Sequence, residues 1–361
     1  MEKQTIDTIC ALRSQLNNLA ECSGEEKRTK ACLMEFLRKN TSLRLVDEGL
    51  WFYAVHEEEG AAETIAFRAD MDALPFGDSA SHLCGHDGHS AVLAGLGLLL
   101  ESKKLGRNII LIFQHAEEDG QGGKICCQAL DRYHVDRIYA FHNIPGWAEG
   151  AVLLRRNTFA CASRGMTLSF TGAPSHAAYP ENGRNPGFAA ARLISGLPGL
   201  VNRECYKGLA MATLIGSKIG TKAFGSAAGS AEVWLTLRTW YEEDMSLLVS
   251  SIKENALTES SCDGVEVSFT FCDVFPATIN NNTLLERLEK ICRETGLDCI
   301  QVQEPFRWSE DFGYYGKNSK AVMVGIGAGE SWPQLHTENF EFNDNIIKPA
   351  LTLFSSLAQF G

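Results

Sequence analysis

The sequence predicts an α/β fold, in which a discontinuous domain with a mostly parallel sheet is interrupted by an inserted α+β domain. Three observations predict this arrangement. Short apolar strands alternate with helical segments, and polar clusters follow the strands directly. This alternating pattern stops near residue 160 and returns near residue 276. We therefore expect the first domain at residues 1–160 and 276–361, and the insertion at residues 161–275.

The N-terminal part predicts two helices and three strands. Helical periodicity covers residues 4–20 and 24–39, and Ser23 is the expected N-cap of the second helix, with Glu26 three residues later. The strands are expected at residues 43–47, 51–56 and 63–68. The third strand leads to Asp70 and Asp72 at its carboxyl end, which is where open α/β sheets place their ligands.

The rest of the chain continues the pattern. A buried helix is expected at residues 87–100, and the apolar run 108–113 is typical of a strand inside a parallel sheet. A helix near residues 121–130 and a strand at 136–141 follow. The insertion is expected to contain strands 166–171, 209–218, 230–239 and 264–274 with helices 185–198 and 241–257. The returning segment is expected to contain helix 282–295, strand 320–326 and helix 344–358.

Composition excludes several classes of partner. The chain has 361 residues, of which 45% are hydrophobic and 22% charged, as in ordinary soluble globular proteins. The net charge of −12, without a Lys/Arg cluster, argues against nucleic acid and against an anionic membrane. The start lacks a signal-peptide pattern, and the 12 cysteines are scattered without a Cys-x-x-Cys motif, so we expect reduced thiols and a cytoplasmic protein.

Residues with metal-binding side chains follow separate predicted strands. The clusters are Asp70 with Asp72, Cys84 with His86, Glu117 with Glu118, and His142. Because the carboxyl ends of parallel strands meet at one edge of a sheet, we expect these side chains to converge. With His336 they offer nitrogen, sulfur and oxygen donors, which suit Zn²⁺, Mn²⁺, Co²⁺ or Ni²⁺.

The adjacent carboxylates Glu117 and Glu118 favour a metal site over a simple surface loop. Without a metal ion, two neighbouring carboxylates raise each other's pKa and cost stability. With one, the first can bind the metal while the second stays available as a general base for water. A solvated loop for this pair and a packed cysteine at Cys84 are the alternatives for each motif taken alone.

Eight stretches carry a family resemblance. They are RADMDALP at 68–75, HLCGHDGH at 82–89, FQHAEE at 113–118, HNIP at 142–145, GAPSHAA at 172–178, LRT at 237–239, EDF at 310–312 and HTENF at 336–340. In this order they resemble the aminoacylase/hippuricase-like metallo-amidohydrolases, which include auxin-conjugate hydrolases, N-acyl-amino-acid deacylases and related zinc carboxypeptidases. The resemblance runs from about residue 65 to the end of the sequence.

The resemblance implies a hydrolase with two divalent metal ions. The implied metal ligands are Cys84, His86, Glu118, His142 and His336. Glu117 resembles the general base that activates the bridging water and later protonates the leaving amine. Asp72 resembles the residue that orients a ligand or this base.

The inserted domain is expected to contribute to the same reaction. His176 resembles a histidine that reaches the active site of a neighbouring subunit and stabilises the oxyanion, which implies a homodimer through the insertion. For His176, a polar turn residue after Pro174 is the alternative. Arg238 or Arg164 is a candidate to bind the substrate carboxylate, and Glu310 is a further substrate-binding candidate.

Two stretches depart from the family pattern. The N-terminal run 12–20 lacks the expected Arg-Arg-x-x-His-x-x-Pro-Glu motif, and residues 222–229 replace an Asn-Val-Ile-Pro segment, with Gly225 near the position of the Asn. Because that segment helps to hold substrate in the family, an unusual substrate is expected.

The favoured function is hydrolysis of an N-acyl amino acid or a similar small amide. The alternatives are a metallo-dipeptidase or aminopeptidase, a non-catalytic binding protein, and a thiol hydrolase that uses Cys84 with His86 or His89. The thiol mechanism leaves the two glutamates, His142 and His336 without a role. The intact set of ligand-type residues argues against a binding protein.

Overall fold

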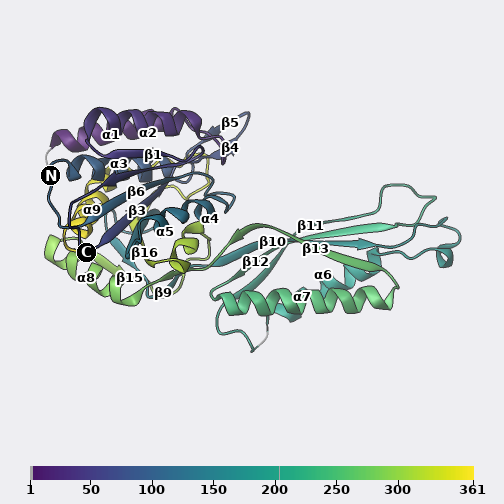
Figure 1. Ribbon diagram of the computed structural model, residues 1–361. Helices are drawn as coiled ribbons and strands as arrows, with labels where there is room; N and C mark the ends of the chain where they lie inside the picture. Colours follow the sequence, from purple (N-terminus) through teal and green to yellow (C-terminus); the bar gives the residue numbers. More distant parts are fainter. Residues whose placement is uncertain (1–2, 203) are drawn as a thin grey trace. The chain divides into compact units, whose positions relative to one another are not determined.

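The computed structural model describes residues 3–202 and 204–361, and the chain divides into two compact units (Figure 1). The first unit consists of Met1–Phe159, Thr278–Pro305 and Glu310–Gly361. The second consists of Ala160–Ala277 and the short segment Phe306–Ser309. Within the described residues, no helix combines the length and apolar character needed to cross a membrane.

An eight-stranded sheet forms the centre of the first unit. In spatial order its strands are β1 (Arg44–Asp47), β2 (Phe52–His56), β6 (Asn108–Gln114), β3 (Thr64–Asp70), β7 (Arg137–Pro145), β16 (Lys320–Gly329), β8 (Val152–Leu154) and β15 (Cys299–Gln301). The central strands β6, β3, β7 and β16 run parallel, whereas β1, β2 and β6 pair antiparallel at one side. The predicted mostly parallel sheet is therefore confirmed.

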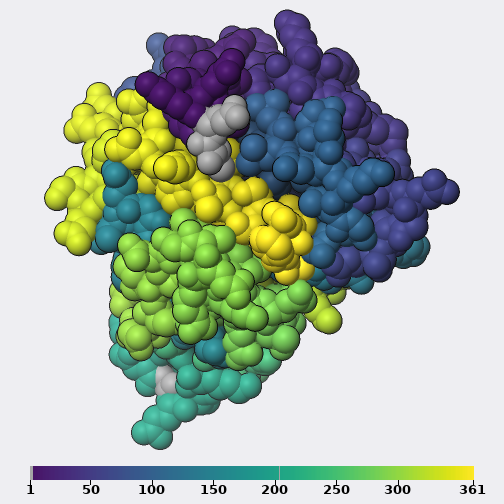
Figure 2. Space-filling view, turned by 90° about the vertical axis from the view of Figure 1, so that its left-hand side faces the viewer, coloured from purple at the N-terminus to yellow at the C-terminus, as the bar shows by residue number. Residues whose placement is uncertain are grey.

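The central strands are buried on both faces, which explains their continuous apolar sequences. In β6, Ile109, Leu111 and Phe113 face a large hydrophobic core, and the intervening residues are buried as well. Five helices contribute to this core: α1 (Lys3–Asn17), α2 (Lys27–Asn40), α3 (His86–Leu100), α8 (Asn282–Thr295) and α9 (Ile347–Phe360). Figure 2 shows the N-terminal segment in purple beside the C-terminal segment in yellow, and α1 indeed contacts α9.

The predicted N-cap at Ser23 is wrong. Helix α2 begins at Lys27, and the Ser23 hydroxyl donates to Asp72 Oδ2 at 2.7 Å instead. The carboxylate of Glu21 accepts the backbone N–H groups of the second and third residues of the helix, from Arg28 at 2.8 Å and Thr29 at 2.9 Å. Glu21, which lies outside the local capping pattern, thus satisfies N–H groups at the start of the helix, whereas the Ser23 hydroxyl is bonded to Asp72.

The remaining elements of the first unit are short. They are β4 (Leu74–Phe76), β5 (Ser79–Ser81), α4 (Gly122–Cys126), α5 (Gln128–Arg132), β9 (Asn157–Ala160), β14 (Thr278–Asn280) and 3₁₀ helices at Asp311–Lys317 and Asp344–Ile346. The single helix expected at residues 121–130 is therefore two short helices.

The described residues of the second unit form an antiparallel sheet with two α-helices. The strand order is β11 (Ala210–Ile219), β12 (Ser230–Thr239), β10 (Ala162–Thr171) and β13 (Glu266–Phe275). Alternate residues of β12, namely Val233, Leu235 and Leu237, share a core with α6 (Gly187–Val201) and α7 (Glu242–Cys262). A 3₁₀ helix lies at Pro180–Asn182. The burial of every second residue in β12 is typical of a sheet with one covered face, as expected for an α+β domain.

Candidate metal centre

The sheet of the first unit brings the predicted ligands together at the carboxyl ends of β3, β6 and β7. Three overlapping groups of ligand atoms lie within 4.8 Å of one another: Cys84 with His86 and His142, Cys84 with Glu118 and His336, and His86 with Glu117 and Glu118. Strands β6, β3 and β7 are neighbours in the sheet, so residues distant in sequence meet at this edge.

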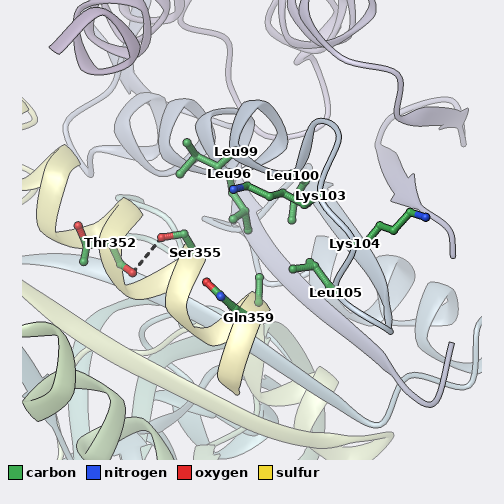
Figure 3. Close-up of a pocket in the computed structure, with 10 residues that line it drawn as sticks. Leu96, Leu99, Leu100, Lys103, Lys104, Leu105, Thr352, Ser355 and Gln359 are labelled. Carbon is green, nitrogen blue, oxygen red and sulfur yellow. Dashed lines mark hydrogen bonds between the residues drawn. The ribbon is translucent and has the colours of Figure 1, made fainter. Parts of the chain in front are cut away.

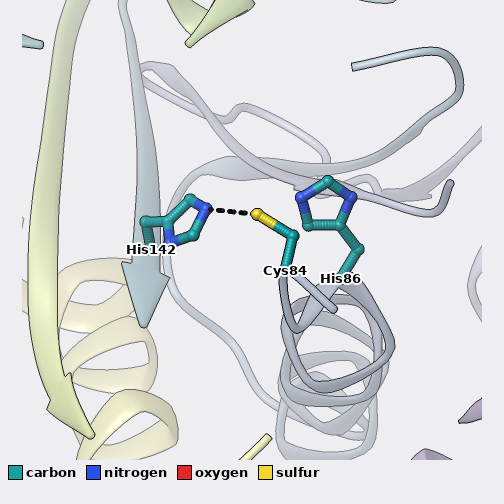
Figure 4. Close-up of side chains that lie close together, drawn as sticks. All are labelled: Cys84, His86 and His142. Atoms are coloured by element: carbon teal, nitrogen blue, oxygen red, sulfur yellow. Dashed lines mark hydrogen bonds between the residues drawn. The ribbon is translucent and has the colours of Figure 1, made fainter. Parts of the chain in front are cut away.

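Gly85 allows Cys84 and His86 to point into the same space. Its φ is +91°, a conformation that glycine adopts without steric cost, and helix α3 starts immediately afterwards. A Cβ at this position would lie 2.5 Å from Asn143 Oδ1. The turn places Cys84 Sγ 3.5 Å from His142 Nε2, with the His86 ring beside them (Figure 4).

The Nε2 atom of His86 is held ready for a ligand. Its Nδ1 contacts the Asp72 carbonyl oxygen at 3.0 Å and Asp72 Oδ1 at 3.1 Å, which fixes the ring. Nε2 lies 3.8 Å from Glu118 Oε1, and neither buried atom has a hydrogen-bond partner within the described residues. A nitrogen and an oxygen that face each other without hydrogen-bond partners fit two ligands of a divalent cation bound between them.

The two remaining histidines complete the donor set. His142 Nδ1 donates to the Asn143 carbonyl oxygen at 2.8 Å, and burial lowers the pKa of His142 well below its usual range, so the ring is neutral as a metal ligand requires. His336 has a φ of +62° and donates its backbone N–H to Leu83 O at 2.8 Å. Its Nε2 lies 3.8 Å from Glu118 Oε1 and its side chain is 53% exposed, which opens the centre to solvent.

Glu117 lies beside the ligands among other acidic side chains. It is 5% exposed, and its carboxylate groups with those of Glu310 and Asp311 within 4.8 Å. Burial, and after it the charge of Glu310, raises the pKa of Glu117 well above its usual range. A carboxyl group whose pKa is raised in this way is suited to general acid–base catalysis.

Arg68 balances this buried negative charge. It is 1% exposed and lies 2.6 Å from Asp70, 2.9 Å from Glu310 and 2.8 Å from Asp311. Its Nε donates to Gln114 at 2.9 Å. Glu310 thus pairs with a buried arginine, and the structure places it against Glu117. The sequence signal for Arg68 is a charged residue inside an otherwise apolar strand.

The profile of the peptidase family M20/M25/M40 matches residues 66–359. The chain belongs to this family. Its relatives include an N-acetyldiaminopimelate deacetylase from Oenococcus oeni, which is 26% identical over 94% of each chain. The M20 chain is thus a metal-dependent hydrolase that acts on amide bonds.

Two solved structures have the same fold as this M20 chain. A dinuclear metal binding peptidase of the M20 family from Bacillus subtilis superposes with a TM-score of 0.86, at 22% identity over 99% of this chain and 98% of that chain. The aminobenzoyl-glutamate utilization protein from Klebsiella pneumoniae gives a TM-score of 0.78, at 21% identity over 99% and 97%.

Asp72 connects the candidate metal centre to the N-terminal segment. Its Oδ2 accepts from the Ser23 hydroxyl at 2.7 Å and from the Glu118 N–H at 2.9 Å, while its Oδ1 faces His86. These contacts restrain the His86 ring and the backbone of Glu118. Ser23 and its neighbour Glu26 were missed as site residues, because the N-terminal family motif is absent and their contacts are long-range.

Three predicted site residues belong to the second unit. His176 is exposed, and its Nδ1 accepts from Ala178 N–H at 3.1 Å. Arg238 donates to the Arg307 carbonyl at 3.0 Å and to Ser309 Oγ at 2.8 Å. Arg164 lies 3.7 Å from Glu242. These contacts of His176, Arg238 and Arg164 all lie within the second unit.

The opposite end of α3 provides a contrast to the metal centre. A cavity of about 380 Å³ lies there against α9, and leucines and two lysines dominate its lining (Figure 3). The lining residues are Leu96, Leu99, Leu100, Lys103, Lys104, Leu105, Thr352, Ser355, Ala358 and Gln359. These side chains include no carboxylate, thiol or imidazole, whereas His86, Asp87 and His89 lie at the first turn of the helix.

Proposed function

We propose that this M20 hydrolase cleaves the amide bond of an N-acyl amino acid or a similar small amide, with two divalent metal ions. One observation carries the proposal: five ligand-type side chains converge beside a carboxyl group whose pKa is raised. The relative named as an N-acetyldiaminopimelate deacetylase supports an N-acyl amino acid as the substrate class.

The proposed metal ligands are Cys84, His86, Glu118, His142 and His336. Zinc, manganese, cobalt and nickel all fit this mixture of sulfur, nitrogen and oxygen donors. A bound divalent ion supplies a Lewis acid for the substrate carbonyl and lowers the pKa of water from 15.7 to about 7. Asp72 orients His86 and the backbone of Glu118 for this binding.

Glu117 is the proposed general base. It takes a proton from the attacking water and later delivers it to the leaving nitrogen, so that the amine departs neutral. Burial and the neighbouring Glu310 favour the protonated carboxyl, which is the form that donates in the second step. His176 of a partner subunit is proposed to stabilise the oxyanion, and Arg238 or Arg164, with Glu310, to bind the substrate.

A dipeptidase or aminopeptidase is the second candidate, supported by the likeness to the M20 peptidase from Bacillus subtilis. Such an enzyme accepts a free α-amine, whereas an N-acyl amino acid hydrolase does not require one. The thiol mechanism is disfavoured, because it gives no role to the carboxylates of Glu117 and Glu118 or to His336, which group with Cys84 and His86.

The deciding experiment combines metal analysis with a substrate screen. The protein is purified without chelator, its metal content is measured by elemental mass spectrometry, and release of free amine is followed with N-acetyl and N-benzoyl amino acids beside matched dipeptides. We expect bound metal, activity on the acylated substrates, and loss and recovery of activity with chelator and added metal. Activity on dipeptides alone would establish the peptidase, and a metal-free protein inhibited by thiol alkylation would overturn the proposal.

A further inference from the structure

The turn that carries Glu117 and Glu118 has an unusual backbone. Ala116, the residue before Glu117, has a φ of +49°, which lies in the left-handed region. A residue with a Cβ occupies this region at an energetic cost and remains there only when its surroundings hold it. The elements that contact Ala116 therefore decide the shape of the turn.

Glu26 is one of the residues that contact Ala116, although the two lie far apart in the sequence. Its side chain is almost completely buried at 2% exposure. Its Oε1 accepts the backbone N–H of Ala116 at 2.8 Å and that of Gly24 at 3.0 Å. The contact ties the N-terminal segment to the turn directly before the proposed base and ligand.

The same segment holds the turn at a second point. Ser23 donates to Asp72 Oδ2, and this oxygen also accepts the N–H of Glu118. In addition, the backbone of Ala73 donates to Glu21 O at 2.8 Å. Residues 21–26, which we call the support loop, thus contact both sides of the turn: Ala116 through Glu26, and Glu118 through Asp72.

Glu26 adopts this position at a cost to stability. Its second oxygen, Oε2, is buried and has no hydrogen-bond partner among the residues that the structure describes. Burial, and then the charge of Asp72, raises the pKa of Glu26 to about 7. A side chain selected for stability alone would not leave a carboxylate oxygen in this state, so another role for the residue is indicated.

We propose that Glu26 is a positioning residue, whose carboxylate holds Ala116 in the left-handed conformation. With Ala116 in this conformation, Glu118 Oε1 lies 3.8 Å from both His86 Nε2 and His336 Nε2. The inference rests on the proposed function, because it assumes that Glu118 binds metal and that Glu117 acts on the substrate.

The test uses the full chain with three substitutions. Glu26→Ala removes the acceptor of the Ala116 N–H, Glu26→Gln keeps an acceptor oxygen without the charge, and Glu25→Ala removes an exposed neighbouring carboxylate. Zinc affinity is measured by competition with a chromogenic chelator, and kcat and KM are measured on the best amide found in the screen. Thermal unfolding of the metal-free proteins reports their stability.

We expect Glu26→Ala to weaken zinc binding by about 10- to 100-fold, the usual effect of losing a residue that supports metal ligands. The variant should also lower kcat while KM changes little. Glu26→Gln should recover most of both losses, and Glu25→Ala should match the wild type. Adding Ala116→Gly to Glu26→Ala should restore part of the zinc affinity, because glycine adopts a positive φ without support.

Zinc affinity and kcat at the wild-type level in a folded Glu26→Ala protein would overturn the inference. So would a Glu26→Gln protein that is folded but as impaired as Glu26→Ala. If Glu26→Ala does not fold, Glu26→Asp replaces it, since its shorter side chain keeps the charge but cannot reach Ala116 in the same way. A wild-type protein that neither binds zinc nor hydrolyses amides overturns the proposed function instead, so the two failures are distinguishable.

Discussion

The two units of this chain treat charge in opposite ways. The first unit buries a connected set of ionisable side chains at one edge of its sheet, with Arg68, Asp70 and His86 at 1% exposure or less. In the described part of the second unit, Asp244 is the one acidic or basic side chain that is buried, and backbone N–H groups of residues 207 and 208 satisfy it. Because buried charge costs stability, its concentration at one edge of the sheet supports the proposed site there.

The largest expected effect separates the two adjacent carboxylates of the first unit. Glu117→Gln should lower kcat by about 10²- to 10⁴-fold, the contribution of a general base, and leave metal content intact. Glu118→Gln should instead weaken metal binding, since its Oε1 is the unsatisfied atom that faces His86. Metal analysis and kcat on the same preparations check both results. Retained turnover in Glu117→Gln would refute the proposed base.

The next prediction compares one arginine from each unit. Arg68→Met should destabilise the protein by about 3–5 kcal/mol, because it leaves buried carboxylates without their partner. Arg192→Met is the matched control, since Arg192 pairs with Glu259 and Asp263 at the surface of the second unit. We expect no measurable change there. Urea unfolding of the metal-free variants measures both, and equal losses would remove the distinction between the units.

A smaller effect tests whether the second unit takes part in catalysis. His176→Ala should lower kcat by about 10²- to 10³-fold without loss of metal, as expected for an oxyanion donor. Glu181→Ala, an exposed neighbour, is the control. If His176 acts in the site of a partner subunit, mixing the His176→Ala and Glu117→Gln proteins should restore activity through hybrid dimers. Absence of recovery in mixtures that exchange subunits would contradict that role.

The sequence predicted what depends on local pattern. Apolar runs identified six of the eight strands of the central sheet, whereas the three-residue strands β8 and β15 were not predicted, and the fold class is confirmed. The short motifs around Cys84 and Glu117 could be placed after strands, and the structure brings their side chains together. Support for these motifs comes from residues distant in sequence, such as Glu26 at Ala116 and Arg68 at Asp311, and no local pattern reveals such pairs. The wrong cap at Ser23 has the same origin, because a long-range bond to Asp72 replaced a local one.

The smallest expected effect concerns the pH dependence of stability. In the folded protein the pKa of Glu26 is about 7, against an ordinary value of 4.5. The folded state therefore keeps a proton that the unfolded state has already lost, and stability decreases as the pH rises through this window. With about 1.4 kcal/mol for each unit of pKa, the wild type should lose on the order of 3 kcal/mol relative to Glu26→Gln between these two pH values.

Urea unfolding of the metal-free wild type and of Glu26→Gln, at several pH values from about 4.5 to 7.5, measures this difference. Other groups that titrate in this range, such as Glu118 with a pKa of about 7, are present in both proteins, so their contributions largely cancel. If the two stability curves converge toward low pH and diverge toward neutral pH, the ionisation of Glu26 in the support loop lowers the stability of the folded protein. Parallel curves would show that the ionisation of Glu26 does not lower the stability of the folded protein.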